Sequence, residues 1–565
     1  MSHATRGRIL LRPTQLGLRL VLEILSSEGL MRKWLLIALL LWTALTEAVT
    51  NDLGKRWWSY VEYLADDKLE GRLTGSEGHR RAAEFVAEQF KKDGLTPAGP
   101  AGYIQPVKFL SRRVIEKQSS LALVRGGRIQ PLALGDDAII SSRFVPKGPI
   151  DAALAFAGYG LSVPELHYDD FKGLDLGGKL AVYVYGGPTS VPGPLRAHYS
   201  SLEERWKALK RAGAVGTIVL FNPHHMDIPW PRLTVLRTQP AMLLADPALD
   251  EAPGMAFSAT LNPARAEKLF EGSGHTFDEL ISLADAGKPL PTFPLPVSLK
   301  ARVAIEPKAV ISQNIAGILR GTDPKLREEY IVLSAHVDHL GVGEPINGDH
   351  IYNGAMDNAS GVATMLDTAA TLHESGTKLR RSILFLIVTG EEKGLLGSRY
   401  FVAHPTVPRS SIVGDLNVDM FLPVIPLKIL TVLGLKDSDL GPLLRSVAEP
   451  MGIEIQDDPE PERNLFIRSD QYNFIKAGVP SIYFKVGARA GTPEAATEKR
   501  WLTEHYHAPS DDTKQPVDLA AAAKYDELVL HLAEAMADRD ERPQWNQDSF
   551  FRRYVKRSSA AHGRM

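Results

Sequence analysis

The chain of 565 residues contains no cysteine, which excludes disulfide bonds and thiolate chemistry. Any metal ion must therefore be held by histidine and carboxylate side chains. The net charge at pH 7 is only −2, so the chain lacks the positive excess typical of nucleic acid binding or of attachment to an anionic surface. We expect no nucleic acid partner.

Long apolar runs are also missing after residue 48, so no later stretch approaches a membrane-spanning helix. Before that point, "MRKWLLIALLLWTALTEAVTND" has a basic start, an apolar stretch at 34–45 and small residues at 46–48. This order predicts a secretory signal peptide at 31–48, and its apolar stretch is short for a membrane span. An uncleaved anchor is the alternative. We expect Met31 to be the true start, residues 1–30 to be an upstream extension, and the mature protein to be periplasmic or extracellular.

The texture of the sequence changes at about Gly126 and again at about Leu290. Between these points the chain is rich in glycine and proline and carries short apolar runs, which indicates a small β-rich unit. The flanking segments 107–124 and 298–321 have the pattern of strands that could pair with each other. A module inserted between two neighbouring strands of another domain gives this arrangement.

We therefore predict a catalytic domain in two parts, 49–125 and 291–540, with an insert domain at 126–290 and a polar tail at 541–565 that forms a loose end. From Tyr330 onward, continuous apolar strands alternate with helical stripes. This alternation predicts an α/β fold with a mixed, mostly parallel sheet covered by helices on both faces.

Ionisable side chains follow several predicted strands of this sheet, and others lie in a glycine-flanked turn before a helix and in a late proline-containing loop. In such sheets ligands bind outside the carboxyl ends of the strands, so we expect these side chains to converge. In chain order they are His336, Asp338, Asp357, Glu391, Glu392, Asp419, His505, His507, Asp511 and Asp512.

Each of these positions has a simpler explanation when it is considered alone. A histidine at a strand end is usually a hydrogen-bonding group, adjacent glutamates usually begin a solvated helix, and Asp357 before Asn-Ala-Ser-Gly reads as a helix cap. Together they favour a metal site, because two histidines and three carboxylates would suit two zinc ions if one carboxylate is shared. Glu391 is then left over, and Glu392 beside it would point in another direction.

The motifs resemble, in order and wording, the co-catalytic zinc aminopeptidases of clan MH, metallopeptidase family twenty-eight. The resemblance covers the chain from about Asp52 to Met536. Its motifs are "EGRLTGSEGHRRAAEFVAEQF", "SAHVDHLG", "NGAMDNASG", "TGEEKGLLGS", "NVDM", "RSDQYNF" and "YHAPSDD". The stretch "AFAGYGLSVPELHYDDFKGLDLGGKLAVYVYGGP" is similar to the protease-associated (PA) insert of that family.

The resemblance implies two zinc ions per chain and a ligand set for each. His336, Asp357 and Asp419 match the ligands of one ion. Asp357, Glu392 and His507 match the ligands of the other, so Asp357 would bridge the two ions.

The resemblance also implies roles around these ligands. Glu391 matches the general base, and Asp338 matches the carboxylate that orients His336. His339 and His505 have no ligand role in the family pattern, so we expect them to lie behind the ligands or at the surface.

Two positions depart from the family pattern. Met356 stands where many relatives have an acidic residue, and Ile467 stands where many have tyrosine. Neither change removes a ligand, but both could alter the substrate pocket. His224 and His225 fall outside the motifs, and we expect them on a surface loop.

The resemblance implies an exported di-zinc aminopeptidase that acts on peptides with a free N-terminus, with no stable membrane span once the signal is removed. A carboxypeptidase or dipeptidase on the same metal site is an alternative, and Arg463, Arg468 or Arg489 could then bind the substrate carboxylate. A non-catalytic protein that binds partners through its insert is a further alternative, and a glutaminyl cyclase is less expected. The oligomeric state and the preferred substrate residue are left open.

Overall fold

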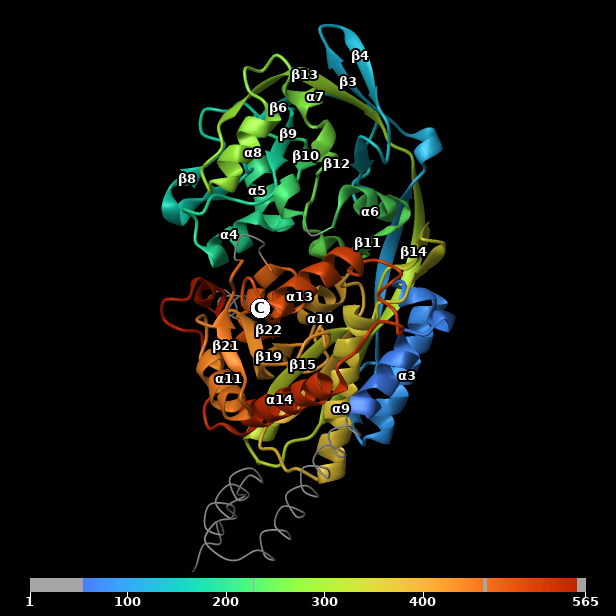
Figure 1. The fold of residues 1–565 in the computed structure, drawn as a ribbon, viewed down its shortest axis with the longest axis vertical. Helices are drawn as coiled ribbons and strands as arrows, with labels where there is room; N and C mark the ends of the chain where they lie inside the picture. Colours follow the sequence, from blue (N-terminus) through green and yellow to red (C-terminus); the bar gives the residue numbers. More distant parts are fainter. Residues whose placement is uncertain (1–53, 227, 461–464, 556–565) are drawn as a thin grey trace, which may run out of the picture.

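The computed structural model describes residues 54–226, 228–460 and 465–555, and its two large sheets lie end to end along the molecule (Figure 1). The predicted signal peptide at 31–48 lies outside the described residues. Residues 54–64 are helical and precede the first strand. No helix of the described part of the chain is long and apolar enough to cross a membrane.

The lower sheet in Figure 1 has ten strands with a parallel centre. In spatial order the strands are β11 (Ala241–Leu244), β2 (Ile104–Val114), β14 (Ile305–Leu319), β18 (Ser382–Val388), β15 (Tyr330–His336), β19 (Ile412–Asn417), β22 (Ser481–Gly487), β20 (Ile429–Leu433) and β21 (Glu454–Asp457), with β1 (Thr96–Pro97) beside β14. Strands β18, β15, β19 and β22 are parallel, whereas β14 and β20 run antiparallel to them. The parallel strands are buried along almost their whole length, which explains their continuous apolar runs.

Helices cover both faces of the lower sheet (Figure 1). They are α3 (Glu77–Lys92), α9 (Ser360–Ser375), α11 (Leu440–Ala448) and α14 (Leu519–Asp538) on one face, and α10 (Leu396–Ala403) and α12 (Gln471–Lys476) on the other. Along β15, Ile331 and Leu333 pack into the hydrophobic core under α3, α9, α11 and α14. Val332 packs on the opposite face with Phe401 of α10 and Phe474 of α12. This alternation follows from the two-residue period of a strand, and the predicted α/β fold class is confirmed.

The upper sheet has eight strands and also has a parallel centre. In spatial order they are β4 (Arg128–Leu132), β3 (Ser120–Arg125), β13 (Thr292–Arg302), β6 (Ile150–Ala157), β9 (Leu180–Val184), β10 (Gly216–Leu220), β12 (Phe257–Leu261) and β5 (Ala138–Ile140). Its helices include α5 (Leu202–Arg211), α7 (Glu267–Phe270) and α8 (Phe277–Asp285). Val182 packs with Phe270 on one face of the sheet, and Tyr183 packs with Trp206 on the other.

Shorter elements complete the two units. They are the hairpins β7 (Ser162–Val163) with β8 (Tyr168–Asp169) and β16 (Gly341–Ile346) with β17 (Asp349–Tyr352), and the helices α4 (Gly193–Ser200), α6 (Trp230–Val235) and α13 (Pro493–Glu504).

Two antiparallel strand pairs connect the sheets. β2 and β14 pair over 104–114 and 305–315, and their neighbours β3 and β13 pair in the upper sheet, as the flanking segments predicted. The sheets do not follow the predicted insert limits of 126–290, because β3 and β13 lie outside these limits and yet belong to the upper sheet. Conversely, β11 lies inside the limits and pairs with β2 in the lower sheet. The limits were predicted from the glycine and proline content of the sequence, which reports loops. The strand pairs β2–β14 and β3–β13 instead run continuously from one sheet into the other.

The structure corrects the loose end expected in the tail at 541–565 for the part that it describes, residues 541–555. Trp545, Phe551 and Tyr554 are only 7%, 0% and 5% exposed and pack in a cluster with Tyr472 of α12. The surrounding residues are polar, so average composition hides three aromatic side chains that each bury a large apolar area.

Candidate metal centre

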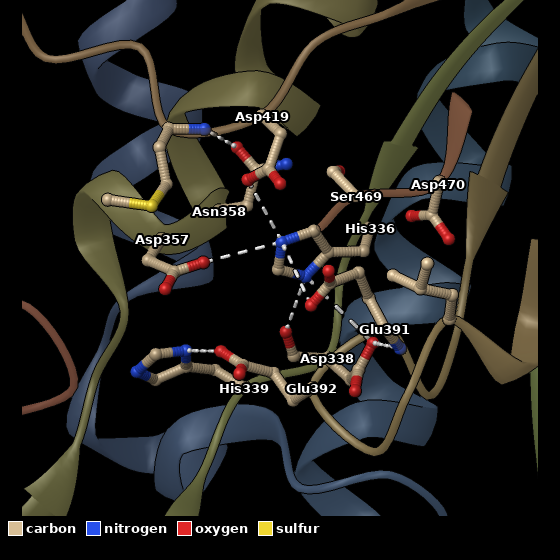
Figure 2. A network of polar contacts seen from close by, with 12 residues as sticks. His336, Asp338, His339, Asp357, Asn358, Glu391, Glu392, Asp419, Ser469 and Asp470 are labelled. Atoms are coloured by element: carbon tan, nitrogen blue, oxygen red, sulfur yellow. Dashed lines mark hydrogen bonds and ion pairs between the residues drawn. The ribbon is translucent and has the colours of Figure 1, made fainter. Parts of the chain in front are cut away.

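The carboxyl ends of three parallel strands bring the candidate side chains to one edge of the lower sheet (Figure 2). His336 is the last residue of β15, Glu391 and Glu392 follow β18, and Asp419 follows β19. These side chains are only 1% to 11% exposed. Buried charges are normally paired or bound to a metal, so this edge is a candidate metal centre.

Asp357 lies between two histidines. Its Oδ1 is 3.3 Å from Nε2 of His336, and its Oδ2 is 3.2 Å from Nε2 of His507. Oδ1 of Asp419 is 3.2 Å from the same His336 nitrogen, and Oε2 of Glu392 is 3.1 Å from the same His507 nitrogen. Ligand atoms about 2.0–2.2 Å from a tetrahedral zinc lie about 3.4 Å from one another. The spacing therefore fits an ion on either side of Asp357.

Two further side chains reach the same positions. Oε2 of Glu391 is 3.9 Å from Nε2 of His336, and Nδ1 of the fully buried His339 is 2.6 Å from Oε1 of Glu392. His339 thus lies within the cluster, as Figure 2 shows, rather than at the surface. The groups whose ligand atoms all lie within 4.8 Å of one another are His336, Glu391 and Asp419, and His339, Asp357 and Glu392.

Asp511 supports the loop that carries Asp357. Its carboxylate accepts hydrogen bonds from the backbone N–H of Met356 at 2.9 Å and from that of Asp357 at 3.1 Å. The Gln515 amide donates to the same carboxylate at 2.7 Å. Sequence reasoning placed Asp511 near the site but gave it no role, because "YHAPSDD" does not say which backbone lies opposite.

Asn358 ties the Asp357 loop to the Asp419 loop. Its side chain donates to the carbonyl of Val418 at 2.9 Å and accepts from the N–H of Met420 at 3.2 Å, on either side of Asp419. It also accepts from the N–H three residues later, at 2.9 Å, and so caps the turn that Asp357 was a candidate to cap. The neighbouring asparagine thus leaves the aspartate free to face the histidines.

Asp338 contacts His336 in a different way from the one expected. Nδ1 of His336 lies 3.1 Å from the backbone carbonyl oxygen of Asp338 but 4.0 Å from its carboxylate. The prediction that this carboxylate orients the ring is wrong at that distance. The carboxylate accepts instead from the Thr74 hydroxyl at 2.9 Å and from the backbone N–H of Glu391 at 3.1 Å. Because Asp338 is two residues from His336, its carbonyl reaches the ring first.

The carboxylates raise the pKa values of both histidines. Burial alone would lower the pKa of His507, but Glu392 and Asp357 raise it to about 9. Burial would also lower the pKa of His336, but Glu391 and Asp419 raise it well above its usual value. A cation held in place of these protons would satisfy the same carboxylates.

The two adjacent glutamates differ in pKa direction. Burial would raise the pKa of Glu392, but His507 and His339 hold it well below its usual value. Burial raises the pKa of Glu391 well above its usual value, and the opposing attraction of His336 does not cancel this effect. Position alone therefore separates two chemically identical side chains.

The remaining candidates contact residues outside the cluster, namely His505 with Ser510, Arg489 with Glu454, and His224 and His225 with Asp285. Arg463 lies outside the described residues. Arg468 lines the pocket beside the cluster.

That pocket combines apolar and charged walls. Around the cluster it is lined by Met420, Leu422, Leu465, Arg468, Ser469, Tyr483, Lys485, Glu498, Leu502 and Tyr506. Met356 and Ile467 are buried and do not line the pocket themselves, but Met356 packs in a cluster with Trp501 and with the pocket-lining Leu422. Arg232 of α6 donates to the carbonyl of Leu502 at 3.1 Å, so the upper unit contacts one wall.

The profile of peptidase family M28 matches residues 314–533, which run from β14 to α14 and contain every candidate ligand. Residues 314–533 therefore form an M28 peptidase domain. This assignment confirms the family expected from the ordered motifs.

The chain is also similar to individual proteins that are named as peptidases. The probable leucine aminopeptidase 2 of Aspergillus oryzae is 28% identical over 246 residues, 41% of this chain and 45% of that protein. Carboxypeptidase Q of Bos taurus is 23% identical over 64% of each chain. The chain thus matches less than two thirds of the length of either curated relative. The solved aminopeptidase from Aneurinibacillus sp. has a TM-score of 0.52 and 18% identity over 86% of this chain and 95% of its own, which supports the fold.

Proposed function

We propose that this M28 peptidase is an exported di-zinc aminopeptidase that removes N-terminal residues from peptides. The proposal rests chiefly on Asp357, whose two carboxylate oxygens face different histidines at 3.3 and 3.2 Å. A shared carboxylate between two sets of nitrogen and oxygen donors is what a pair of zinc ions requires. The name of the Aspergillus oryzae relative, a probable leucine aminopeptidase, agrees with it.

The donor chemistry fits zinc. His336 and Asp419 would hold one ion, Glu392 and His507 the other, and Asp357 would bridge them. When bound, the pair supplies an acidified water and polarises the scissile carbonyl, since zinc lowers the pKa of water from about 15.7 to about 7.

Glu391 would act as the general base. Its carboxylate would take a proton from the attacking water and pass it to the nitrogen of the leaving amine. Two observations support this role: burial raises the pKa of Glu391, and the Asp338 carboxylate fixes its backbone N–H. A carboxylate with a raised pKa holds a proton more readily at neutral pH.

A carboxypeptidase is the second candidate. Arg468 and Lys485 line the pocket and could bind a substrate carboxylate, and the relative from Bos taurus is named Carboxypeptidase Q. The pocket also contains Glu498, whose Oε1 is 3.7 Å from Nζ of Lys485, so part of this positive charge is already paired. We therefore favour the aminopeptidase.

One assay separates the two candidates. The zinc-loaded protein should hydrolyse aminoacyl-p-nitroanilides and C-terminally amidated peptides, and N-acetylation should abolish turnover because the free amine is required. Turnover of N-blocked peptides with loss on C-terminal amidation would instead establish the carboxypeptidase. Absence of both activities in protein with full zinc content would refute both.

Export has a separate test. If the segment at 31–48 is a cleaved signal, the exported protein should begin near Val49, and mass spectrometry of its N-terminus measures this. A mature protein that retains residues 34–45 would favour the membrane anchor.

A further inference from the structure

Arg72 is a fully buried arginine whose side chain binds only backbone carbonyls. It ends the short helical segment Asp67–Arg72 that precedes α3. Its Nε donates to the carbonyl of Val337 at 2.8 Å, its Nη1 to that of Asn353 at 2.6 Å and its Nη2 to that of Gly354 at 2.9 Å. Nη1 also donates to the carbonyl of Leu64.

Three of the four carbonyls that Arg72 binds belong to the segments next to the candidate ligands His336 and Asp357. Val337 lies directly after His336, whereas Gly354 lies three residues before Asp357. Nε2 of His336 and Oδ1 of Asp357 are 3.3 Å apart, so a small shift of either loop would change the spacing of the ligand atoms. One planar guanidinium thus spans the backbones on which this distance depends.

The charge of Arg72 is compensated by the site and not by a direct ion pair. Burial lowers its pKa to about 10, and the attraction of Asp511, Asp338, Asp357 and Glu392 opposes the decrease. A buried charge without such compensation is costly. The buried guanidinium of Arg72 is therefore stabilised by the nearby carboxylate cluster.

The backbone is bent to bring Arg72 to this position. Glu70, Gly71 and Arg72 have positive φ angles of 48°, 63° and 49°, and side chains other than glycine adopt this region at a cost. A Cβ atom at Gly71 would lie 2.2 Å from the carbonyl oxygen of Tyr352, so the close approach needs glycine. Thr74, two residues after Arg72, donates to the Asp338 carboxylate at 2.9 Å.

We propose that Arg72 is a positioning residue that sets the spacing of the metal ligands by clamping the His336 and Asp357 loops together. The segment 67–74, which lies outside the matched family region 314–533, then supports the metal centre. The proposal rests on the proposed function for the presence of metal but predicts a property that activity alone does not report.

The test is zinc affinity, measured by competition with a chelator, in Arg72→Lys and Arg72→Met. Lysine keeps the charge and loses the planar fork, whereas methionine removes both. We expect zinc to bind at least tenfold more weakly in both variants, because spacing depends on the fork. If Arg72 affected zinc only by the repulsion between its positive charge and the ions, Arg72→Lys would bind zinc with the wild-type affinity and Arg72→Met would bind it more tightly. Either result would overturn the proposal.

Arg381 provides the matched control. Its side chain is 1% exposed, and it donates to a Glu329 carboxylate oxygen at 2.8 Å and to the carbonyls of Arg539 and Asp540. It directly precedes β18, at the end of the strand opposite to Glu391. Arg381→Lys should lower the melting temperature without changing zinc affinity.

The outcomes separate the failure of this proposal from that of the function. Wild-type protein that binds no zinc would refute the function. Wild-type protein that binds zinc, with unchanged affinity in folded Arg72→Lys, would refute the clamp alone. If both Arg72 variants fail to fold while Arg381→Lys and Arg381→Met fold, Arg72 serves folding rather than ligand spacing, and the proposal is also refuted.

Discussion

The two large sheets have the same parallel centre and different strand ends. In the lower sheet, β15 ends in His336, and β18 and β19 are followed within four residues by Glu391, Glu392 and Asp419. In the upper sheet, the four residues after β6, β9 and β12 contain no histidine or carboxylate, and only His224 follows β10 within this distance. Within the described ranges, both groups of side chains that are close enough to hold a metal ion lie at the edge of the lower sheet. A parallel sheet provides an edge for a site, but side-chain identity decides whether chemistry follows.

Even the histidine clusters of the two units differ in burial. In the upper unit, Asp285 lies 2.7 Å from His224 and 3.4 Å from His225, but these three side chains are 33% to 64% exposed. In the lower unit, the side chain of Asp357 between its two histidines is 4% exposed. Water screens exposed charges, whereas buried charges interact strongly, so burial separates a candidate metal centre from a surface cluster.

The largest expected effect is on the shared carboxylate. Asp357→Ala should lose both ions and all measurable turnover, because each ligand set loses a member. Asp285→Ala, the matched change in the upper unit, should keep the metal content of the wild type. Metal analysis after dialysis measures both. Stoichiometric binding of two ions by Asp357→Ala would contradict the bridge.

The adjacent glutamates should give the next largest effect and differ from each other. Glu391→Ala should keep its metals while kcat falls by roughly 10²–10⁴-fold, because only the proton transfer is lost. KM should change less, since the pocket remains. Glu392→Ala should lose metal as well as rate. Metal loss in Glu391→Ala with full metal content in Glu392→Ala would reverse the two assignments, a real test because Glu391 also lies within ligand range.

Asp338→Ala should have a smaller effect, and its kind matters more than its size. Since the carboxylate binds the Glu391 backbone and not the His336 ring, we expect kcat to fall about 10–100-fold with metal content retained. Thr74→Val, which removes one partner of the same carboxylate, should have a weaker effect. If Asp338→Ala lost zinc while kcat per bound metal pair stayed unchanged, the idea that Asp338 positions Glu391 would be contradicted.

The last prediction concerns the pH dependence of zinc binding. A metal requires neutral His507, whose pKa is raised to about 9 without metal, so apparent zinc affinity should fall about tenfold per pH unit below that value. The same shift stabilises the metal-free fold fully below about pH 6.5, and this stabilisation is lost as the pH rises through about 9. Titrations from pH 6 to pH 9 measure the slope, which should be shallower in His507→Ala. A flat profile in the wild type would contradict the ligand role.

The sequence predicts the parallel centre well. Strands such as β15 and β18 are continuous apolar runs, since both faces of each are covered. The ordered motifs also name the side chains that converge, because the carboxyl ends of parallel strands meet at one edge.

Partners across the fold are harder to predict. Arg72 lies in a stretch that indicates only the start of a helix, and three of its four carbonyl partners come from loops more than 260 residues away. The roles of Asn358 and Asp511 depend on backbone groups, which every residue carries and no motif records. The tail was misjudged because three buried aromatic residues stand among polar neighbours.

The central claim is that two ions share Asp357 at the edge of the lower sheet. Anomalous diffraction at the zinc edge from crystals of the zinc-loaded protein tests it most directly. We expect two peaks about 3.5–4 Å apart, one beside His336 and Asp419 and the other beside Glu392 and His507, with Asp357 between them. A single peak at this edge, or zinc only at Asp285 in the upper unit, would contradict the account.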